Sequence, residues 1–314
     1  RIHGTIDYYD SKSYDLLYLK VLPYTSGFNR AWTNIGDTRN RGWEVSLSTV
    51  PVETKDFHLG VNLSYYRNKE ELIRLQDPKM KEDINNGLFV GYPVNGVHYN
   101  YKQVGIWQEN EADLAAIYGQ KPGEVKVADL DGNGKIDGND KTYFGYSQRP
   151  DYVLGLLGGF RYKNFEISMQ WTAGLHASRM LSGEYRNAFG STNGRALLKF
   201  LADGRWTPEN PDARFPRLTF LNKSHYLEDS DLWLMDGSYL RLKVAEIGYT
   251  FRDIPAFRKV GVKSLKVYFS GYNLLTLFSD LNDIDIDPEG ATSGSNIDSY
   301  PNVRIFNFGV NITF

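Results

Sequence analysis

The segment YPNVRIFNFGVNITF (300–314) decides the fold, because its side chains alternate strictly between an apolar face and a small polar face. The apolar positions are Phe306, Phe308, Val310, Ile312 and Phe314, and the positions between them are Asn307, Gly309, Asn311 and Thr313. A period of two predicts a β-strand. Aromatic and β-branched residues confined to one face are typical of the closing strand of a transmembrane β-barrel.

The composition combines many aromatic residues with a polar average. The 314 residues include 30 Gly, 22 Tyr and 17 Phe, yet the mean hydropathy is -0.46. The longest nearly apolar run, residues 152–160, falls far short of the ~20 residues that a membrane-spanning helix needs. If the chain crosses a membrane, it therefore crosses as tilted strands of about ten residues.

Charge and cysteine content exclude several classes of protein. The chain has no Cys, which removes a disulfide framework, thiolate catalysis and Cys-ligated zinc. Its 36 basic and 38 acidic residues give a net charge of -2, so no basic field is available for DNA or RNA. We therefore expect no nucleic-acid partner.

Alternation with a period of two predicts eight strands. They cover approximately residues 1–12, 39–50, 57–66, 151–162, 165–174, 236–251, 264–275 and 302–314. In 236–251 the apolar register changes, which predicts a β-bulge near Ala245 or Glu246. The first strand begins without an initiator Met or a signal peptide, so we expect further sequence upstream of Arg1.

The predicted connections alternate between long and short. The long ones are about 13–38, 67–150, 177–235 and 276–301, and the short ones are 51–55, 163–164 and 252–263. Outer-membrane barrels combine short periplasmic turns with long extracellular loops, so every long segment is expected outside. The extended stretch 96–108 is then interpreted as a strand or hairpin within an external segment. Apolar residues at helical spacing predict a short helix within 193–203.

The segment DLDGNGKIDGND (129–140) matches a calcium-binding loop. Side-chain oxygens stand at loop positions one, three, five, nine and twelve, and glycine stands at six, where the loop must turn sharply. Position seven contributes a backbone carbonyl. The predicted ligands are Asp129, Asp131, Asn133, Lys135 through its carbonyl, Asp137 and Asp140.

Two departures from an ideal loop bear on this prediction. Position twelve is Asp140 rather than the longer Glu, and the flanking segments read as extended rather than helical. A calcium sensor needs a helix pair that opens, so we expect a structural role for a divalent cation, with Ca²⁺ as the expected ion. The alternative is a polar turn that is stabilised by its own side-chain to backbone hydrogen bonds.

A second acidic cluster precedes Pro288. It lacks the glycine placement of a calcium loop, and we interpret it as part of a solvated external loop. Its members are Asp280, Asp283, Asp285 and Asp287.

Motifs for catalysis are absent from the sequence. There is no G-x-S-x-G elbow, no H-E-x-x-H pair and no Walker loop, so we expect no enzyme activity. Trp107, Trp206 and Trp233 lie in or beside the long loops, where they could stack on sugar rings or anchor the loops. Anchoring is the favoured interpretation, and no substrate-binding residue is predicted.

Several blocks of sequence together resemble one family, the SusC/RagA-like TonB-dependent outer-membrane transporters. The blocks follow in the family's order over essentially the whole chain. They are NIGDTRNRGWEVSL (34–47), GIWQ (105–108), the calcium loop, RWTPENPDARFPRL (205–218), DGSYLRLKVAEIGYTF (236–251), YFSGYNLLTL (268–277), DPEG (287–290) and the terminal strand.

This resemblance implies an all-β fold with one partial domain, residues 1–314, whose external region 67–150 carries the calcium loop. The eight strands would be the last of an antiparallel transmembrane β-barrel of about 22 strands, completed by an N-terminal plug and further strands. The implied location is the bacterial outer membrane in Bacteroidetes, among its lipids, with the long loops extracellular. The implied activity is TonB-dependent import of oligosaccharides or oligopeptides together with a SusD-like surface lipoprotein.

One alternative remains open from the residues alone. Eight strands can close into a complete small barrel, and its external loops would then form an adhesin-like, calcium-dependent binding surface. An arc of a larger barrel differs because its two edge strands lack partners within the chain.

Overall fold

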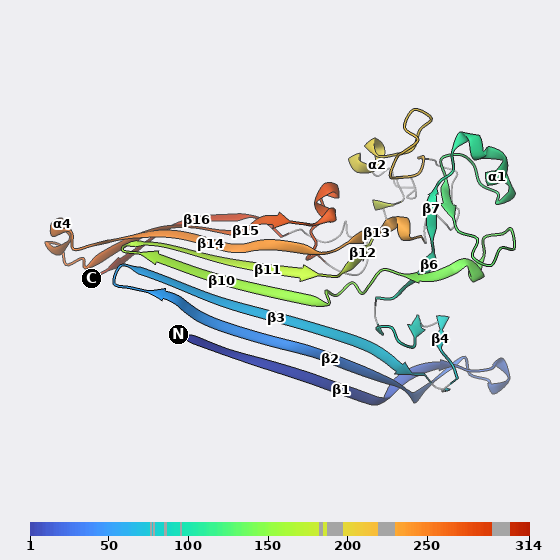
Figure 1. Cartoon of the computed structure of the whole chain (residues 1–314), viewed down its shortest axis with the longest axis horizontal. Coiled ribbons are helices and arrows are strands. Elements are labelled where there is room, and N and C mark those ends of the chain that lie inside the picture. Colours follow the sequence, from blue (N-terminus) through green and yellow to red (C-terminus); the bar gives the residue numbers. More distant parts are fainter. Residues whose placement is uncertain are drawn as a thin grey trace.

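The structure is a computed structural model that describes residues 1–314 except 76, 78, 85, 86, 95, 182–184, 187–196, 219–229 and 291–301. Its main feature is one antiparallel sheet with the order β1-β2-β3-β10-β11-β14-β15-β16 (Figure 1). The strands are β1 (Ile2–Val21), β2 (Arg30–Glu53), β3 (Phe57–Arg74), β10 (Tyr152–Tyr162), β11 (Phe165–Leu175), β14 (Tyr239–Arg252), β15 (Ser264–Leu277) and β16 (Ile305–Thr313). No described helix has both the length and the apolar character that crossing a membrane requires.

The sheet is a meander whose two ends differ. Strands that follow one another along the sheet are joined at one end by the short segments 54–56, 163–164 and 253–263, the last of which contains helix α4 (Pro255–Arg258). Both chain termini lie at this end (Figure 1). The opposite end carries 22–29, 75–151, 176–238 and 278–304. The last three of these are long, as predicted, but 22–29 is shorter than 253–263, so the predicted alternation in length fails at the first connection.

The two faces of the sheet separate apolar from polar side chains, because directly paired residues of neighbouring strands point to the same side. One row contains Ile247, Phe269 and Phe308, which are register partners across β14, β15 and β16. The row beside it on the other face contains Glu246, Ser270 and Asn307. Side chains such as Phe308 are largely exposed in the chain, as expected for a face that contacts lipid.

The long connections build a group of small elements beyond the loop end of the sheet (Figure 1). Four two-stranded sheets pair β4 with β5, β6 with β9, β7 with β8 and β12 with β13. These strands are β4 (Glu82–Asp83), β5 (Leu88–Phe89), β6 (His98–Tyr101), β7 (Gln103–Ile106), β8 (Val125–Val127), β9 (Lys141–Phe144), β12 (Ser178–Met180) and β13 (Leu234–Asp236). The described helices here are η1 (Tyr24–Ser26), η3 (Glu109–Glu111), α1 (Ala112–Ile117), η4 (Gly138–Asp140), α2 (Lys199–Asp203), η6 (Asp231–Trp233) and η7 (Asp280–Ile284).

Eight strands were predicted, and eight form the large sheet. The stretch 96–108 lies outside that sheet, as predicted, because it forms β6 and β7 in the external group. The helix predicted within 193–203 is present as α2, while 193–196 lie outside the described residues.

Three strand ends and one bulge were predicted wrongly. The segment 13–38 is mostly strand, since β1 and β2 continue as a paired ribbon and leave only 22–29 as the connection. β3 likewise continues to Arg74 rather than ending near residue 66. The bulge in β14 lies between Leu242 and Val244, before the predicted position, because Lys243 is left out of the pairing with β15.

The sheet does not close on itself within the described residues. The order begins with β1 and ends with β16, and these two strands are not paired with each other. This arrangement is that of a segment of a larger barrel wall, and it differs from the alternative of a complete eight-stranded barrel.

Gly42 marks a position where the sheet leaves no room for a side chain. A Cβ at this residue would collide with the carbonyl oxygen of Arg67 and with the ring of Tyr9, which crosses Gly42 on the neighbouring strand. The Tyr9 hydroxyl donates to Asn68 Oδ1 at 2.9 Å, so the ring is held in place.

We predict that Gly42→Ala destabilises the sheet by about 1–3 kcal/mol, because overpacking forces the backbone or the tyrosine to move. The folded fraction and the unfolding temperature of the full-length protein in outer membranes measure the effect. Gly159→Ala is the matched control, since a Cβ there meets nothing within 4 Å. Equal behaviour of the two variants would show that the crossing of Tyr9 over Gly42 does not constrain the fold.

Candidate metal centre

The segment 129–140 connects β8 to β9 in the external group of elements. β8 pairs with β7 and β9 pairs with β6, so both flanks of the loop are strands. This agrees with the prediction of extended flanks. A loop that is fixed by two short ladders has no helix pair to open, which favours a static role.

The structure brings three of the predicted ligands together. Asp129, Asp131 and Asp140 each offer a carboxylate oxygen, and these oxygens lie within 4.8 Å of one another. Asn133 lies beside them, with its side-chain nitrogen donating to Asp131 Oδ2 at 2.9 Å. Its side-chain oxygen accepts from the backbone N–H of Lys135 at 2.8 Å. These are the hard oxygen donors that calcium prefers.

Asp137 is not a member of that carboxylate group. Its Oδ1 accepts from the backbone N–H of Asn139 at 2.8 Å and caps η4, the single turn that ends in Asp140. Asp137 therefore positions Asp140 in this structure.

Backbone amides shape the loop around Asp129. Its carboxylate accepts from the N–H groups of Gly132 at 2.8 Å, Asn133 at 3.2 Å and Gly134 at 2.8 Å. Gly132 and Gly134 have φ angles of 72° and 79°, a conformation that glycine adopts without a steric penalty. Desolvation raises the pKa of Asp129, but these hydrogen bonds outweigh it and hold the pKa below its usual value.

Asp140 is the buried member of the group, with an exposed fraction of 0%. Its oxygens accept from the N–H groups of Leu130 at 2.7 Å and Asp137 at 2.8 Å. Within the described part of the chain, no Lys, Arg or His forms an ion pair with it. Buried carboxylates are normally paired with a cation or coordinate a metal, so the donor set fits a divalent ion.

The three tryptophans are buried anchors. Trp107, Trp206 and Trp233 have exposed fractions of 2%, 6% and 1%. Trp107 Nε1 donates to Gln120 Oε1 at 2.7 Å, and Trp206 Nε1 donates to Gln108 Oε1 at 3.0 Å. The favoured interpretation of these residues is therefore confirmed, and none of the three presents a free face to a sugar.

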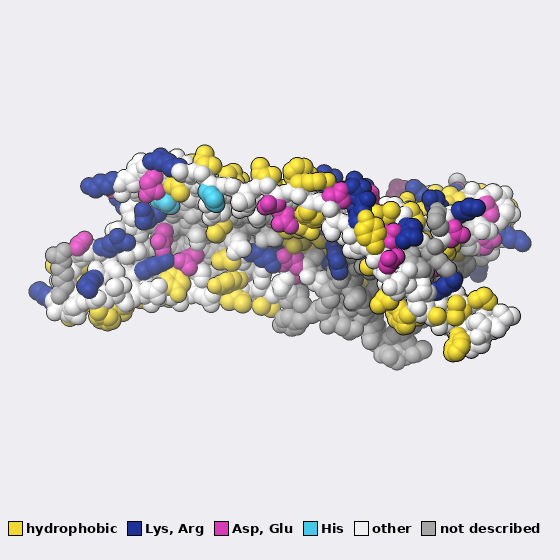
Figure 2. Space-filling view, turned by 90° about the horizontal axis from the view of Figure 1, so that it is seen from below, with side chains coloured by type: hydrophobic (Ala, Val, Ile, Leu, Met, Phe, Trp, Pro, Cys, Tyr) yellow, Lys and Arg dark blue, Asp and Glu magenta, His cyan; other side chains and the backbone are white. Residues whose placement is uncertain are grey.

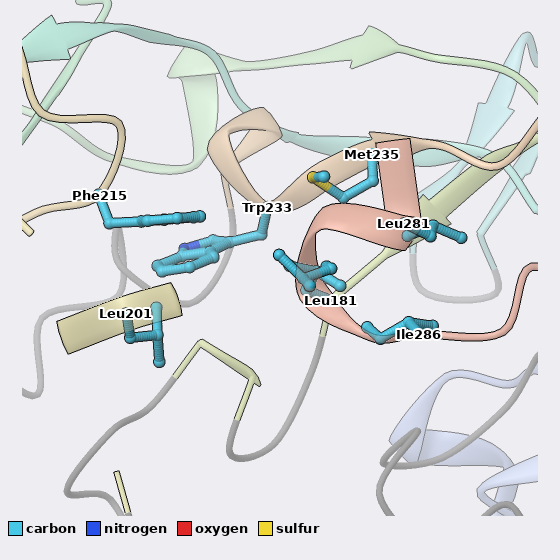
Figure 3. Close-up of a cluster of buried hydrophobic side chains, with 8 residues drawn as sticks. Leu181, Leu201, Phe215, Trp233, Met235, Leu281 and Ile286 are labelled. Atoms are coloured by element: carbon cyan, nitrogen blue, oxygen red, sulfur yellow. The ribbon is translucent and has the colours of Figure 1, made fainter. Parts of the chain in front are cut away.

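Trp233 belongs to a hydrophobic core that joins two long connections (Figure 3). The ring of Phe215 stacks on the ring of Trp233 with centroids 5.7 Å apart. The buried members are Leu181, Leu201, Phe215, Trp233, Met235, Leu281, Ile284 and Ile286. Segments from 176–238 and 278–304 are thus held together outside the sheet.

A charged network ties one of these connections to the sheet. Arg241, on the polar face of β14, donates through Nη2 to Asp287 Oδ1 at 2.7 Å and through Nη1 to Glu289 Oε2 at 2.5 Å. Its Nε donates to Thr276 Oγ1 at 3.0 Å. The side chains of Arg241 and Asp287 are only 4% and 9% exposed.

The expectation of a solvated loop is therefore wrong for Asp287. Burial raises the pKa of this carboxyl, but the bond from Arg241 and the backbone N–H groups of Glu289 and Asn302 outweigh it and lower the pKa overall. Arg241 is distant in sequence, which is why the acidic cluster alone gave no sign of it. The sequence did contain one indication of this network. Two carboxylates stand close together in DPEG (287–290), and two cations, Arg241 and Lys243, alternate along β14.

Relatives match the chain along its entire length. TonB-dependent receptors P3 and P26 of Formosa agariphila are 31% and 32% identical, and the chain covers 32% and 33% of them. TonB-dependent receptor SusC of Bacteroides thetaiotaomicron is 28% identical, with 30% of its length covered. The solved RagAB peptide transporter superposes with a TM-score of 0.74 over the whole chain and 34% of that chain, at 22% identity.

The chain is the C-terminal barrel portion of a SusC/RagA-like TonB-dependent receptor. No family model matches the sequence, so the assignment rests on these relatives and on the fold. The chain spans about a third of the length of the curated relatives it matches. The large sheet therefore forms part of the barrel wall. The long connections carry the calcium-type loop and the carboxylates that bind Arg241.

We predict that Arg241→Met frees the segment 280–290 from the barrel wall. It leaves the buried Asp287 without its cation and Glu289 with Lys243 alone, and breaking a buried pair in this way costs about 3–5 kcal/mol. Hydrogen exchange of the amides in 280–290 should therefore accelerate in the full-length receptor.

Arg252→Met is the control, because Arg252 is exposed at the opposite end of the same strand. Unchanged exchange in Arg241→Met would mean that the hydrophobic core around Trp233 holds the segment without the ion pairs.

Proposed function

We propose that this chain supplies part of the wall and several external loops of an outer-membrane importer for oligosaccharides or oligopeptides. Import would be TonB-dependent and would involve a SusD-like lipoprotein, with the plug, the TonB contact and the remaining strands supplied by other parts of the receptor. The observation that carries the proposal is the match over the whole chain to TonB-dependent receptors, one of them SusC. The apolar outer face and the polar inner face of the sheet support a location in the outer membrane.

The proposed substrates span two chemical classes. The solved relative is described as a peptide transporter, and it is only 22% identical to this chain. The described loops bury their tryptophans, so they offer no sugar platform built from these residues. The proposed substrates therefore include both oligosaccharides and oligopeptides.

We predict that deletion of the receptor gene abolishes growth on one class of polymer-derived oligomer and leaves growth on its monomers intact. Small monomers can diffuse through other pores, whereas large oligomers need active import. Growth on matched panels of oligosaccharides and oligopeptides, with and without TonB, measures this. A deletion strain that grows normally on every oligomer, or uptake that continues without TonB, would contradict the proposal.

We also propose that residues 129–140 hold a structural Ca²⁺. Asp129, Asp131 and Asp140 would supply carboxylate oxygens, Asn133 its side-chain oxygen and Lys135 its backbone carbonyl, with Asp137 as the remaining predicted ligand. The clustered carboxylates and the buried, cation-free Asp140 support this assignment. The ion would neutralise the cluster and fix the connection between β8 and β9.

We predict that the full-length receptor binds Tb³⁺ in competition with Ca²⁺, with luminescence sensitised through Tyr118. The Tyr118 hydroxyl lies 3.4 Å from Asp129 Oδ2, which is close enough for energy transfer. Asp131→Asn should weaken binding by about tenfold or more, because calcium affinity depends on the number of charged ligands.

Asp283→Asn is the control for that measurement, since Asp283 is an exposed aspartate outside the loop. Absence of sensitised luminescence in the wild-type receptor, or equal binding by both variants, would leave the loop as a turn held by its own hydrogen bonds.

A further inference from the structure

On the outward face of β1, β2 and β3, the side chains change from apolar to charged as the strands approach the loop end of the sheet. The register partners Tyr8, Trp43 and Arg67 form one row across these strands, and Tyr152 of β10 continues it. The next row toward the loops contains Asp10, Arg41 and Lys69, and the row after it contains Lys12, Arg39 and Glu71. We call these last two rows, together with Arg67, the basic belt.

The position of the belt relative to the membrane follows from the strand geometry. On β3 the apolar outward positions begin at Phe57 and end at the row of Arg67. Ten residues of strand extend ~33 Å, and a tilt of about 40° reduces this to ~25 Å along the membrane normal. This is the height of the apolar band of an outer-membrane barrel, so the belt lies just outside the hydrocarbon.

The row of Trp43 has the character of the membrane interface. The rings of Tyr8 and Trp43 lie 4.8 Å apart and are 54% and 45% exposed. The guanidinium of Arg67 lies 5.1 Å from the ring centre of Tyr152. Aromatic girdles of this kind occur at the level of the lipid headgroups. Figure 2 shows hydrophobic side chains along one margin of the sheet and charged side chains beyond them toward the loops.

The belt carries an excess of positive charge that the chain offsets only in part. Its cations are Lys12, Arg39, Arg41, Arg67 and Lys69, and its anions are Asp10 and Glu71. Asp10 bonds to Arg39, with Arg39 Nε 2.7 Å from Asp10 Oδ1. Glu71 is shared between Arg41 at 2.8 Å and Lys69 at 2.5 Å. Among the described residues, no carboxylate pairs with Lys12 or Arg67.

Like charges are also placed directly opposite one another. Arg41 is the register partner of Lys69, and Arg39 is the register partner of Lys12. Such pairs destabilise a sheet. Glu71 and Asp10 offset this repulsion only in part, because Glu71 is one anion shared by two cations and Asp10 bonds to Arg39 but not to Lys12. The side chain of Lys69 is 59% exposed and that of Arg41 is 35% exposed, so an external anion has access to both.

The belt has defined edges. Toward the loops, Arg74 is bonded to Asp37 at 2.7 Å, which restores charge balance. Lys69 also lines a cavity of about 350 Å³ together with Glu70 and Asp151, whose carboxylates disfavour an anion inside that cavity. The cations of the basic belt are therefore confined to a strip about two residue rows tall. The height of this strip is comparable with the ~5–7 Å thickness of a lipid headgroup layer.

We propose that this basic belt binds the phosphate groups of an anionic lipid in the outer leaflet. Lys12, which no described carboxylate pairs with, and Lys69, which shares Glu71 with Arg41 and is 59% exposed, contact the phosphates. The acyl chains lie against Tyr8, Trp43 and the apolar rows beneath. This inference rests on the membrane location proposed above and is independent of what the receptor imports.

The test uses the full-length receptor, purified in neutral detergent and freed of lipid. Diphosphoryl lipid A and the same lipid without its phosphates are titrated separately, and bound lipid is counted by native mass spectrometry. The wild type should prefer the phosphorylated form, and that preference should weaken as salt is added. Equal affinity for the two lipids would overturn the proposal without any variant.

The double variant Lys12→Gln/Lys69→Gln should lower the affinity for diphosphoryl lipid A about thirty-fold, because each cation near a lipid surface contributes about fivefold. Lys259→Gln/Lys263→Gln removes two exposed lysines at the opposite end of the sheet and should leave the affinity unchanged. Equal losses in both double variants would assign the binding to net charge and reject the belt. Import is measured separately, so failure of lipid binding leaves the transport proposal intact.

Discussion

The pairing of strands is the constraint on which this chain depends. In hydrocarbon no water can satisfy a backbone N–H or C=O group, so every strand must bond to a neighbour on each side. Inside the sheet this holds from β2 to β15, and β1 and β16 each keep one free edge among the described residues. The same constraint explains the crossing of Tyr9 over Gly42, because a regular ladder leaves little freedom to move a crowded side chain aside.

Local patterns were sufficient to predict the sheet, since each strand carries its own alternation. They were insufficient wherever the outcome depended on partners distant in sequence. The ribbon formed by 13–21 and 30–38 has weak alternation, and only the pairing of β1 with β2 reveals it. The bulge at Lys243 likewise depends on β15, because a residue is left out of a ladder only relative to its partner strand.

The same distinction between local and distant contacts applies to the calcium-type loop and to the Arg241 network. The calcium-type loop was recognisable because its donors lie within twelve successive residues, and the glycines at 132 and 134 permit the turns that gather Asp129, Asp131 and Asp140. The exclusion of Asp137 from that group depends on its capping of η4, a detail of backbone geometry that spacing does not specify. The Arg241 network joins residues about 46 positions apart, so neither segment alone could predict it.

The charged groups serve different ends because they lie on different faces and at different depths. Arg241 faces the polar interior and is buried, so its carboxylates are matched closely and the pairing fixes a loop. The cations of the basic belt face outward, where solvent weakens each ion pair and an excess of charge is tolerated. A wall strand can thus hold its own loops from the inside and select its lipid from the outside, because alternate residues serve the two faces without interfering.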